Sequence, residues 1–225
     1  MPRRLHLRDH APHEEAAPQA LRQTFDADFE ARVVRVWALV GEAIAGATHA
    51  LLAGDRELAK TIVRDDEAID ELVNALVAEV SRSLELGIGT PSDRRRLVAL
   101  VRTLPEIERS GDLAAHIARR AARGLGQEMS PRARGLIERM GEVAATIWRA
   151  ATDAIESSTQ ASLDAVEELD DELDDLHVSL TGELVSGSMP LPVAVEVAMV
   201  ARFYERFGDH AVNLANRQPG RSLVD

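Results

Sequence analysis

The chain has 225 residues, 45% of them hydrophobic, which is enough for one large or two small domains with buried cores. Its 26 Lys and Arg against 38 Asp and Glu give a formal net charge of −12, which disfavours nucleic acid and anionic membranes as partners. The absence of cysteine excludes disulfides, thiolate zinc sites, iron–sulfur clusters and thiol nucleophiles, so a metal site must use oxygen or imidazole ligands.

Residues 1–23 are interpreted as a mobile leader outside the fold. They contain three prolines and three of the seven histidines, without a sustained hydrophobic period. No apolar run approaches the roughly 18 residues that a membrane span needs, and no apolar signal core follows the first residues. We therefore expect neither secretion nor membrane insertion, and the lack of cysteine suits a cytoplasmic protein.

Six long helices are expected after the leader. From Phe25 onward, apolar residues recur three and four apart, as in Val33, Trp37 and Val40, which is the period of an amphipathic helix. No segment alternates like a strand, so the sequence predicts an all-α protein. Capping and breaking residues separate the later helices at five places: Gly54-Asp55, Gly87 to Asp93, Ser130-Pro131, Ser157 to Thr159, and Gly187 to Pro192.

The six helices form two similar sets of three. The second helix of each set carries Asp-x-x-x-Asp, at 66–70 and 170–174, and the third carries Glu-Arg-x-Gly-Asp, at 108–112 and 205–209. Short loops make sequential helices antiparallel neighbours, which predicts two tandem three-helix bundles related by an internal repeat. We place the first repeat at residues 24–127, the second at 128–218, and a C-terminal tail at 219–225.

Each of these motifs points two carboxylates in one direction, because residues four apart share a helix face. Two such helices side by side would present four carboxylates, a set of hard oxygen ligands that suits iron, manganese, magnesium or calcium. Aspartate is a poorer helix former than glutamate, so its use argues for a role beyond solvation. Solvated boundary acids are the favoured interpretation of any single pair; the recurrence in both halves strengthens the case for a cation site, and both interpretations stay open.

Two further features bear on these motifs. Residues 150–201 contain 12 acids and no Lys or Arg, so either solvent screening or a bound cation must offset their repulsion. Gly111 and Gly208 interrupt the third helices, where glycine costs roughly 1 kcal/mol relative to alanine. Close packing against a neighbouring helix and room for an ion both explain these glycines. His116 and Asn213, four residues beyond each motif, are candidate outer ligands or simply part of a polar stripe.

These motifs, above all the run Glu-Arg-Phe-Gly-Asp-His-Ala-Val-Asn from Glu205 to Asn213, resemble the PhoU family over nearly all of residues 25–217. The resemblance implies a cytoplasmic, non-enzymatic regulator that represses the phosphate-starvation response. It implies a sensor histidine kinase and the ATPase subunit of the phosphate ABC importer as partners, and metal clusters in some members; we also expect a homodimer. The metal ligands it implies are Asp66, Asp70, Glu108, Asp112, Asp170, Asp174, Glu205 and Asp209.

Two other functions are weighed against this one. A ferritin-like di-metal oxidase would need two Glu-x-x-His motifs on facing helices, and only the pair Asp174 and His177 comes close. A metal-free acidic scaffold that docks a basic partner differs from the regulator only in whether cations are needed. Hydrolase or transferase chemistry has little support, because the chain has no Gly-rich phosphate loop and no Gly-x-Ser-x-Gly.

Overall fold

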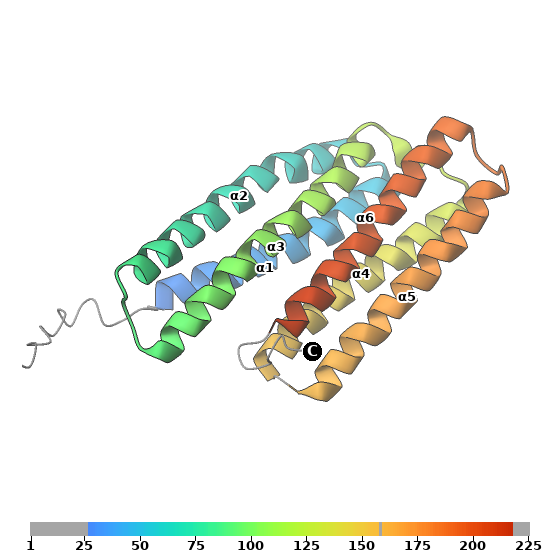
Figure 1. Ribbon diagram of the computed structural model, residues 1–225. Helices are drawn as coiled ribbons and strands as arrows, with labels where there is room; N and C mark the ends of the chain where they lie inside the picture. Colours follow the sequence, from blue (N-terminus) through green and yellow to red (C-terminus); the bar gives the residue numbers. More distant parts are fainter. Residues whose placement is uncertain (1–26, 158, 218–225) are drawn as a thin grey trace, which may run out of the picture.

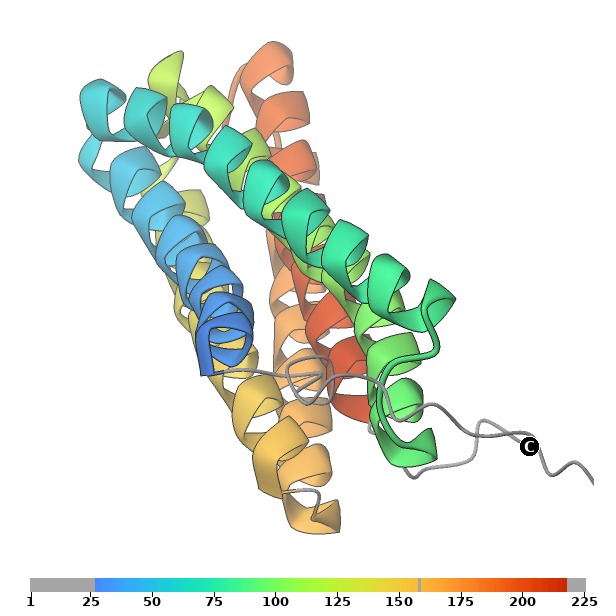
Figure 2. The ribbon, with the colours of Figure 1, turned by 90° about the vertical axis from the view of Figure 1, so that its left-hand side faces the viewer.

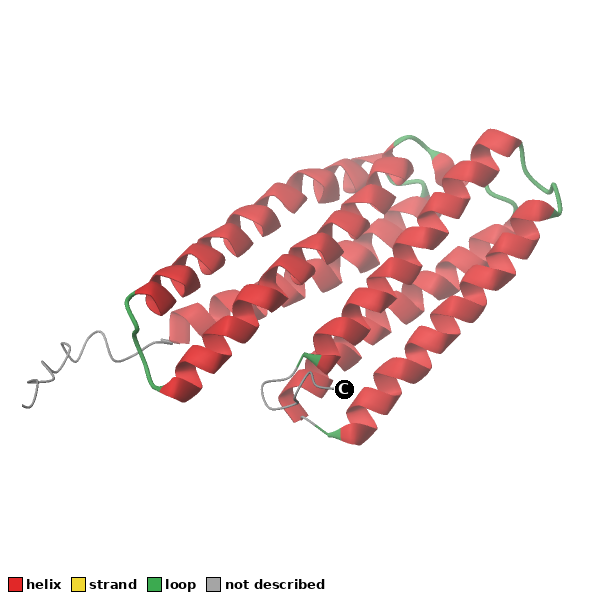
Figure 3. Cartoon of the chain, in the orientation of Figure 1, coloured by secondary structure: helices red, strands yellow, loops and turns green. Residues whose placement is uncertain are grey.

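The computed structural model of the protein describes residues 27–157 and 159–217, so the predicted leader at 1–23 and tail at 219–225 lie outside the described residues. The described part is helical, with loops and turns between the helices and no strand (Figure 3). In chain order the elements are α1 Ala27–Ala53, α2 Arg56–Glu85, α3 Pro91–Ala122, the 3-10 turn η2 Leu125–Gln127, α4 Pro131–Ser157, α5 Gln160–Val185 and α6 Leu191–Asn216.

The predicted starts of α2, α3 and α5 are confirmed by their capping hydrogen bonds, while α6 begins after Pro190 without a side-chain cap. The Asp55 side chain accepts from two backbone N–H groups of the first turn of α2. Thr90 and Asp93 form a reciprocal capping box at the start of α3, and the Thr159 hydroxyl accepts from the backbone of Ser162 in α5. Orphan N–H groups at these helix ends are therefore satisfied by the residues that the sequence places there.

The helices pack as two sets of three that share one core. Within each set every helix contacts the other two, and across the sets α1 packs on α4 and α3 packs on α6. In Figure 1, α3 and α6 lie in front of α1 and α4, with α2 and α5 at the flanks; Figure 2 shows α1 and α2 from the side. The predicted fold class, two tandem three-helix bundles, is confirmed, while the exact boundary at 127/128 stays a prediction.

Buried polar contacts fix the two sets relative to each other. The hydroxyls of Thr48 on α1 and Tyr204 on α6 lie 2.7 Å apart, and Tyr204 is fully buried. The Arg134 guanidinium donates to the carbonyl of Leu52 at 2.6 Å and to that of Gly126 at 2.7 Å, which joins α4 to the end of α1 and to η2. Hydrogen bonds of this kind need one geometry, so they set the register between the halves.

Helix α1 bears on the expectation that the chain has no membrane span. Among the described residues it is the one helix long and apolar enough to cross a membrane by length and composition, with a mean hydropathy of 1.4 over 18 residues. The reason is its richness in alanine and valine with few charges. However, 39% of that window is buried inside the protein, where α1 packs against α2, α3 and α4 as a core helix.

Candidate carboxylate site

The first carboxylate cluster consists of Asp66 and Asp70 on α2 with Glu108 and Asp112 on α3. Asp66 is the buried member, 7% exposed, while the other three are half-buried. Burial raises the pKa of Asp66 to about 6, and repulsion from Asp112, Asp70 and Glu108 adds to the increase. Burial and the neighbouring acids also raise the pKa values of Asp70 and Glu108. These four predicted residues therefore do lie within electrostatic range of one another.

An arginine partly neutralises this first cluster. The Arg119 guanidinium lies 3.3 Å from the Asp66 carboxylate and lowers its pKa against the effects of burial and repulsion. Its second Nη atom lies 2.9 Å from Nδ1 of His116. The sequence interpretation missed Arg119, although it follows Asp112 by seven residues, two turns along the same face of α3. His116 stacks on the ring of Phe203 at 5.2 Å, so it belongs to the contact between α3 and α6.

The second carboxylate cluster consists of Asp170 and Asp174 on α5 with Glu205 and Asp209 on α6. Burial raises the pKa of Asp170 to about 6, with repulsion from Asp174 and Asp209 next in size and a smaller contribution from Glu205. Glu205 pairs with Arg202 one turn earlier on α6. Among the residues that the structure describes, Asp170 has no ion pair like that of Asp66 with Arg119, and Asn216 stands at the matching place, seven residues after Asp209. The second cluster is therefore the less compensated of the two.

The glycines of the two motifs have different surroundings. A Cβ built on Gly208 would lie 2.6 Å from Oδ1 of Asp170 and 2.8 Å from Cδ2 of Leu173. A Cβ on Gly111 would meet Ile69 at 3.5 Å and Oδ1 of Asp66 at 3.7 Å, which is ordinary contact. Gly208 therefore lets α6 approach the α5 carboxylate closely, and close packing explains that glycine. The packing gives no such reason for Gly111.

In neither cluster do the carboxylate groups converge on one common position. Within 27–157 and 159–217, no three side chains of Asp, Glu or His are grouped so that they could hold a metal ion. Asp174 and Asp209, the exposed members of the second cluster, face solvent. The carboxylates are hard oxygen ligands, so their chemistry suits a cation, and convergence on one ion would require rotation about their side-chain bonds.

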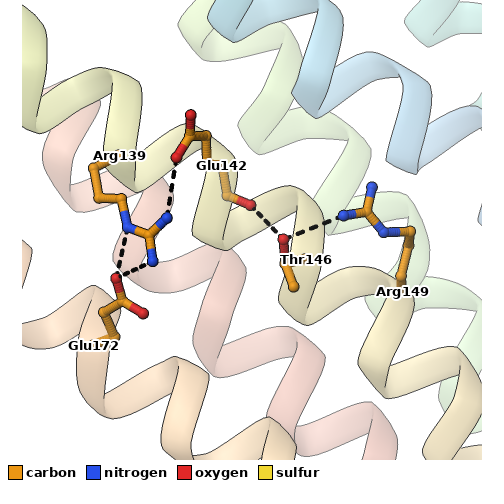
Figure 4. A network of polar contacts seen from close by, with 5 residues as sticks. All are labelled: Arg139, Glu142, Thr146, Arg149 and Glu172. Atoms are coloured by element: carbon orange, nitrogen blue, oxygen red, sulfur yellow. Dashed lines mark hydrogen bonds and ion pairs between the residues drawn. The ribbon is translucent and has the colours of Figure 1, made fainter.

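Arginines from flanking elements neutralise part of the acid-rich segment 150–201. Arg139 on α4 binds Glu172 of α5 at 2.6 Å and Glu142 at 3.0 Å, and Glu142 and Thr146 continue this network towards Arg149 (Figure 4). Two other acids of the segment are paired: Glu183 with Arg132, and Glu196 with Arg120 and Arg123. These pairs do not include Asp170, Asp174 or Asp209.

A buried polar network between α3 and α6 also escaped the sequence interpretation. Arg217 at the end of α6 lies 2.7 Å from the buried Glu106 carboxylate of α3. One turn further along α3, the Ser110 hydroxyl lies 3.2 Å from Nδ1 of His210. Burial lowers the pKa of His210. These contacts connect the two glycine motifs across the interface of the two halves.

The sequence was compared with protein families and known proteins. The model of the PhoU domain matches residues 33–121 and 137–218, one match in each half. The chain belongs to the PhoU family. The phosphate-specific transport system accessory protein PhoU homolog 2 of Mycobacterium tuberculosis is 35% identical over 191 residues, which cover 83% of this chain and 89% of that protein. PhoU homolog 1 of Mycobacterium leprae is 33% identical, covering 83% and 85%.

Solved PhoU structures have the same architecture. The PhoU crystal structure from Pseudomonas aeruginosa matches with a TM-score of 0.76 and 25% identity, covering 84% of this chain and 93% of that one. The PhoU structure from Streptococcus pneumoniae matches in fold with a TM-score of 0.75 and 22% identity, covering 88% and 96%. PhoU membership favours a regulatory accessory protein over the ferritin-like oxidase that the sequence left as an alternative.

Proposed function

We propose that this PhoU-family protein is a cytoplasmic, non-enzymatic negative regulator of phosphate uptake and phosphate-starvation signalling. Its partners in this proposal are the ATPase subunit of the phosphate importer and a sensor histidine kinase. The relatives at 33–35% identity are named as accessory proteins of the phosphate-specific transport system, and they match over most of their length. The observation that carries the proposal is the pair of PhoU domain matches, one on each three-helix set.

Deletion of the gene tests the regulatory role. In phosphate-rich medium we expect the deletion strain to take up phosphate at the rate of starved cells, because the repressing protein is gone. The intact gene supplied on a plasmid should restore repression. Unchanged uptake in the deletion strain would reject the regulator. A pull-down from phosphate-replete cells, probed for the importer ATPase and the kinase, tests the partners separately.

We further propose that the second carboxylate cluster takes up a divalent or trivalent cation, iron, manganese or magnesium, and that the first does so more weakly. Burial raises the pKa of Asp170 most, and repulsion from Asp174 and Asp209 raises it further; a bound cation would relieve this repulsion. In the first cluster Arg119 already supplies a positive charge to Asp66. A cation at the second cluster would join α5 to α6 through Asp174 and Asp209 and so make the contact between these two helices more rigid.

Thermal unfolding with and without added metal tests the cation. Mn²⁺, Mg²⁺ or Fe²⁺ at about a hundred times its Kd should stabilise the protein by about 2.7 kcal/mol. The variant Asp170→Asn/Asp174→Asn should lose most of the shift, and Asp66→Asn/Asp70→Asn should lose little. The variant Asp164→Asn/Glu167→Gln, on exposed positions of the same helix α5, is the matched control and should keep the full shift.

A metal-free acidic scaffold is the second candidate, and the Arg119–Asp66 pair favours it. This pair shows that an arginine of the chain itself can offset the negative charge of a buried carboxylate without a bound ion. If none of the three metals raises the unfolding temperature, the cation proposal fails and the metal-free scaffold remains. The uptake experiment tests the regulatory role separately, because its result does not depend on metal binding.

A further inference from the structure

Seven exposed residues form one line along the outer face of α5, which we call the α5 seam. Their spacing alternates between four and three residues, the spacing of the positions through which two helices pack in a coiled coil. The first four are acidic and the last three are small or apolar: Asp164, Glu168, Asp171, Asp175, Val178, Gly182 and Val185. Val178 is 71% exposed and Val185 is 82% exposed. The α5 seam therefore has an acidic half and an apolar half.

The start of α6 extends the apolar half of the α5 seam. Leu191, Val195 and Met199 follow one another one turn apart, and all three are exposed. A short loop joins α5 to α6, so the end of α5 lies beside the start of α6 (Figure 1). The acids on this part of the hairpin, Glu183 and Glu196, are both paired with arginines of other elements. Exposed apolar patches of this kind mark interaction sites.

The first half of the chain has the same helices but a different outer face. When the Asp-x-x-x-Asp motifs are aligned, the residues of α2 that correspond to the α5 seam are Lys60, Arg64, Glu67, Glu71, Asn74, Ala78 and Ser81. When the Glu-Arg-x-Gly-Asp motifs are aligned, Arg94 and Arg102 of α3 correspond to Leu191 and Met199 of α6. Basic residues of the first half are thus acidic or apolar in the second. The seven positions on α5 are all exposed, so the packing of the helices does not explain this difference.

We propose that the α5 seam and the start of α6 bind a helix of another protein, with Lys or Arg along one half of its contact face and apolar residues along the other. Within 27–157 and 159–217 none of the four acids of the seam is in an ion pair, since the pairs of α5 involve Glu172 and Glu183. The basic half of the partner helix would pair with these acids. Its apolar half would cover Val178, Val185 and the start of α6, as in other complexes that recognise a helix by its apolar face.

The geometry of the seam also limits the size of the partner helix. From Asp164 to Val185 the seam is about 32 Å long at 1.5 Å per residue, so a helix of about 20 residues covers it. A Cβ added at Gly182 would meet no atom within 4 Å, so this position leaves room for a large side chain of the partner.

Two other occupants do not match the α5 seam. If the seams of two copies lay antiparallel, the acids of each copy would cover the valines of the other, and no acid would be paired. Helix α2 of a second copy offers Lys60 and Arg64, but Asn74 and Ser81 stand where apolar residues are needed. The homodimer expected from the sequence would therefore use another surface. An anionic membrane would be repelled by the acidic half.

Photo-crosslinking of the full chain in cells tests the proposal. Benzoylphenylalanine is introduced in place of Val178 or Val195, and in control strains in place of Asn74 or Val98, the corresponding exposed residues of the first half. Ultraviolet light should join the chain to another protein from the first two positions and far less from the controls. Mass spectrometry of the joined segment should show a helix-forming sequence with Lys or Arg in one half and apolar residues in the other. This result does not depend on the proposed role in phosphate regulation.

Binding of that segment, made as a peptide, to the purified chain then tests the charges. Asp171→Lys/Asp175→Lys should weaken binding roughly tenfold or more through like-charge contacts. The matched control is Glu67→Lys/Glu71→Lys, the same change of charge at the corresponding positions of α2, which should leave the Kd unchanged. Far-UV circular dichroism should show the same helicity for both variants.

The proposal is overturned if Val178 and Val195 give no adduct, or no more adduct than the control positions. An adduct with a second copy of this chain, or with a segment that lacks the basic half, overturns it as well. Equal loss of peptide binding in the two charge variants would show that net charge, and not the α5 seam, governs the contact.

Discussion

Substitution of the two motif glycines by alanine should change stability in opposite directions. In a helix interior, alanine is favoured over glycine by about 1 kcal/mol. At Gly111 the added methyl group makes ordinary contacts at 3.5 Å, so Gly111→Ala should gain close to that amount. At Gly208 the methyl group would lie 2.8 Å from Leu173, which is fully buried, and 2.6 Å from the Asp170 carboxylate. Overpacking of this kind costs about 1–3 kcal/mol, so Gly208→Ala should lose about 1 kcal/mol net.

Urea unfolding followed by far-UV circular dichroism measures both variants against the natural chain. The expected gap between them is about 2 kcal/mol, or several degrees in Tm for a chain of this size. Truncation of the obstructing carboxylate in Gly208→Ala/Asp170→Ala should recover part of the loss, because the two sites are in contact. If both glycine variants stabilise the protein equally, then Gly208 does not permit a close approach, and the packing explanation is refuted.

Three further predictions follow from single contacts. The pKa of Asp170 lies above its ordinary value, so the folded state holds its proton more tightly and stability should fall as pH rises from about 4 to about 6; Asp170→Asn should flatten this fall in urea titrations at several pH values. The Thr48 hydroxyl donates to a backbone carbonyl and accepts from Tyr204, so Tyr204→Phe should cost about 1 kcal/mol, and Thr48→Val, which strands a buried phenol hydroxyl, should cost more in thermal unfolding. Gly126→Ala would place a methyl group 1.7 Å from the Leu51 carbonyl oxygen, so it should cost at least about 3 kcal/mol or leave the protein insoluble on expression.

Helices α2, α3 and α5 could be predicted because the residues that begin them act locally. Asp55, Thr90 and Thr159 are caps whose side chains bond to the turn that follows them, so their effect does not depend on the rest of the fold. The internal repeat then determined which helices belong together. Family resemblance and the duplicated motifs pointed to the same architecture, which the structure confirms.

The electrostatic partners could not be found in the same way. Arg119 reaches Asp66 across two helices, and Arg217 reaches Glu106 across the two halves, so both pairs depend on how helices are turned about their axes. Spacing along one helix places residues on a face but does not specify the opposite side chain. The hydrophobicity of α1 was underestimated from the sequence, because Arg35 and Glu42 interrupt its apolar residues although the mean hydropathy over 18 residues is 1.4.

The difference between the two clusters bears on how one fold could respond to a cation. The first cluster lies between α2 and α3 and the second between α5 and α6. Between them, α3 and α6 pack together in the shared core through Ser110 and His210. Because Arg119 already offsets the charge of Asp66 in the first cluster, added metal should hardly change the stability of the contact between α2 and α3. The contact between α5 and α6 at Asp170 has no such arginine within 27–157 and 159–217, so it would gain most from an ion. A cation would then stiffen one half only, and a partner that contacts α5 and α6 would sense it while a partner on α2 and α3 would not.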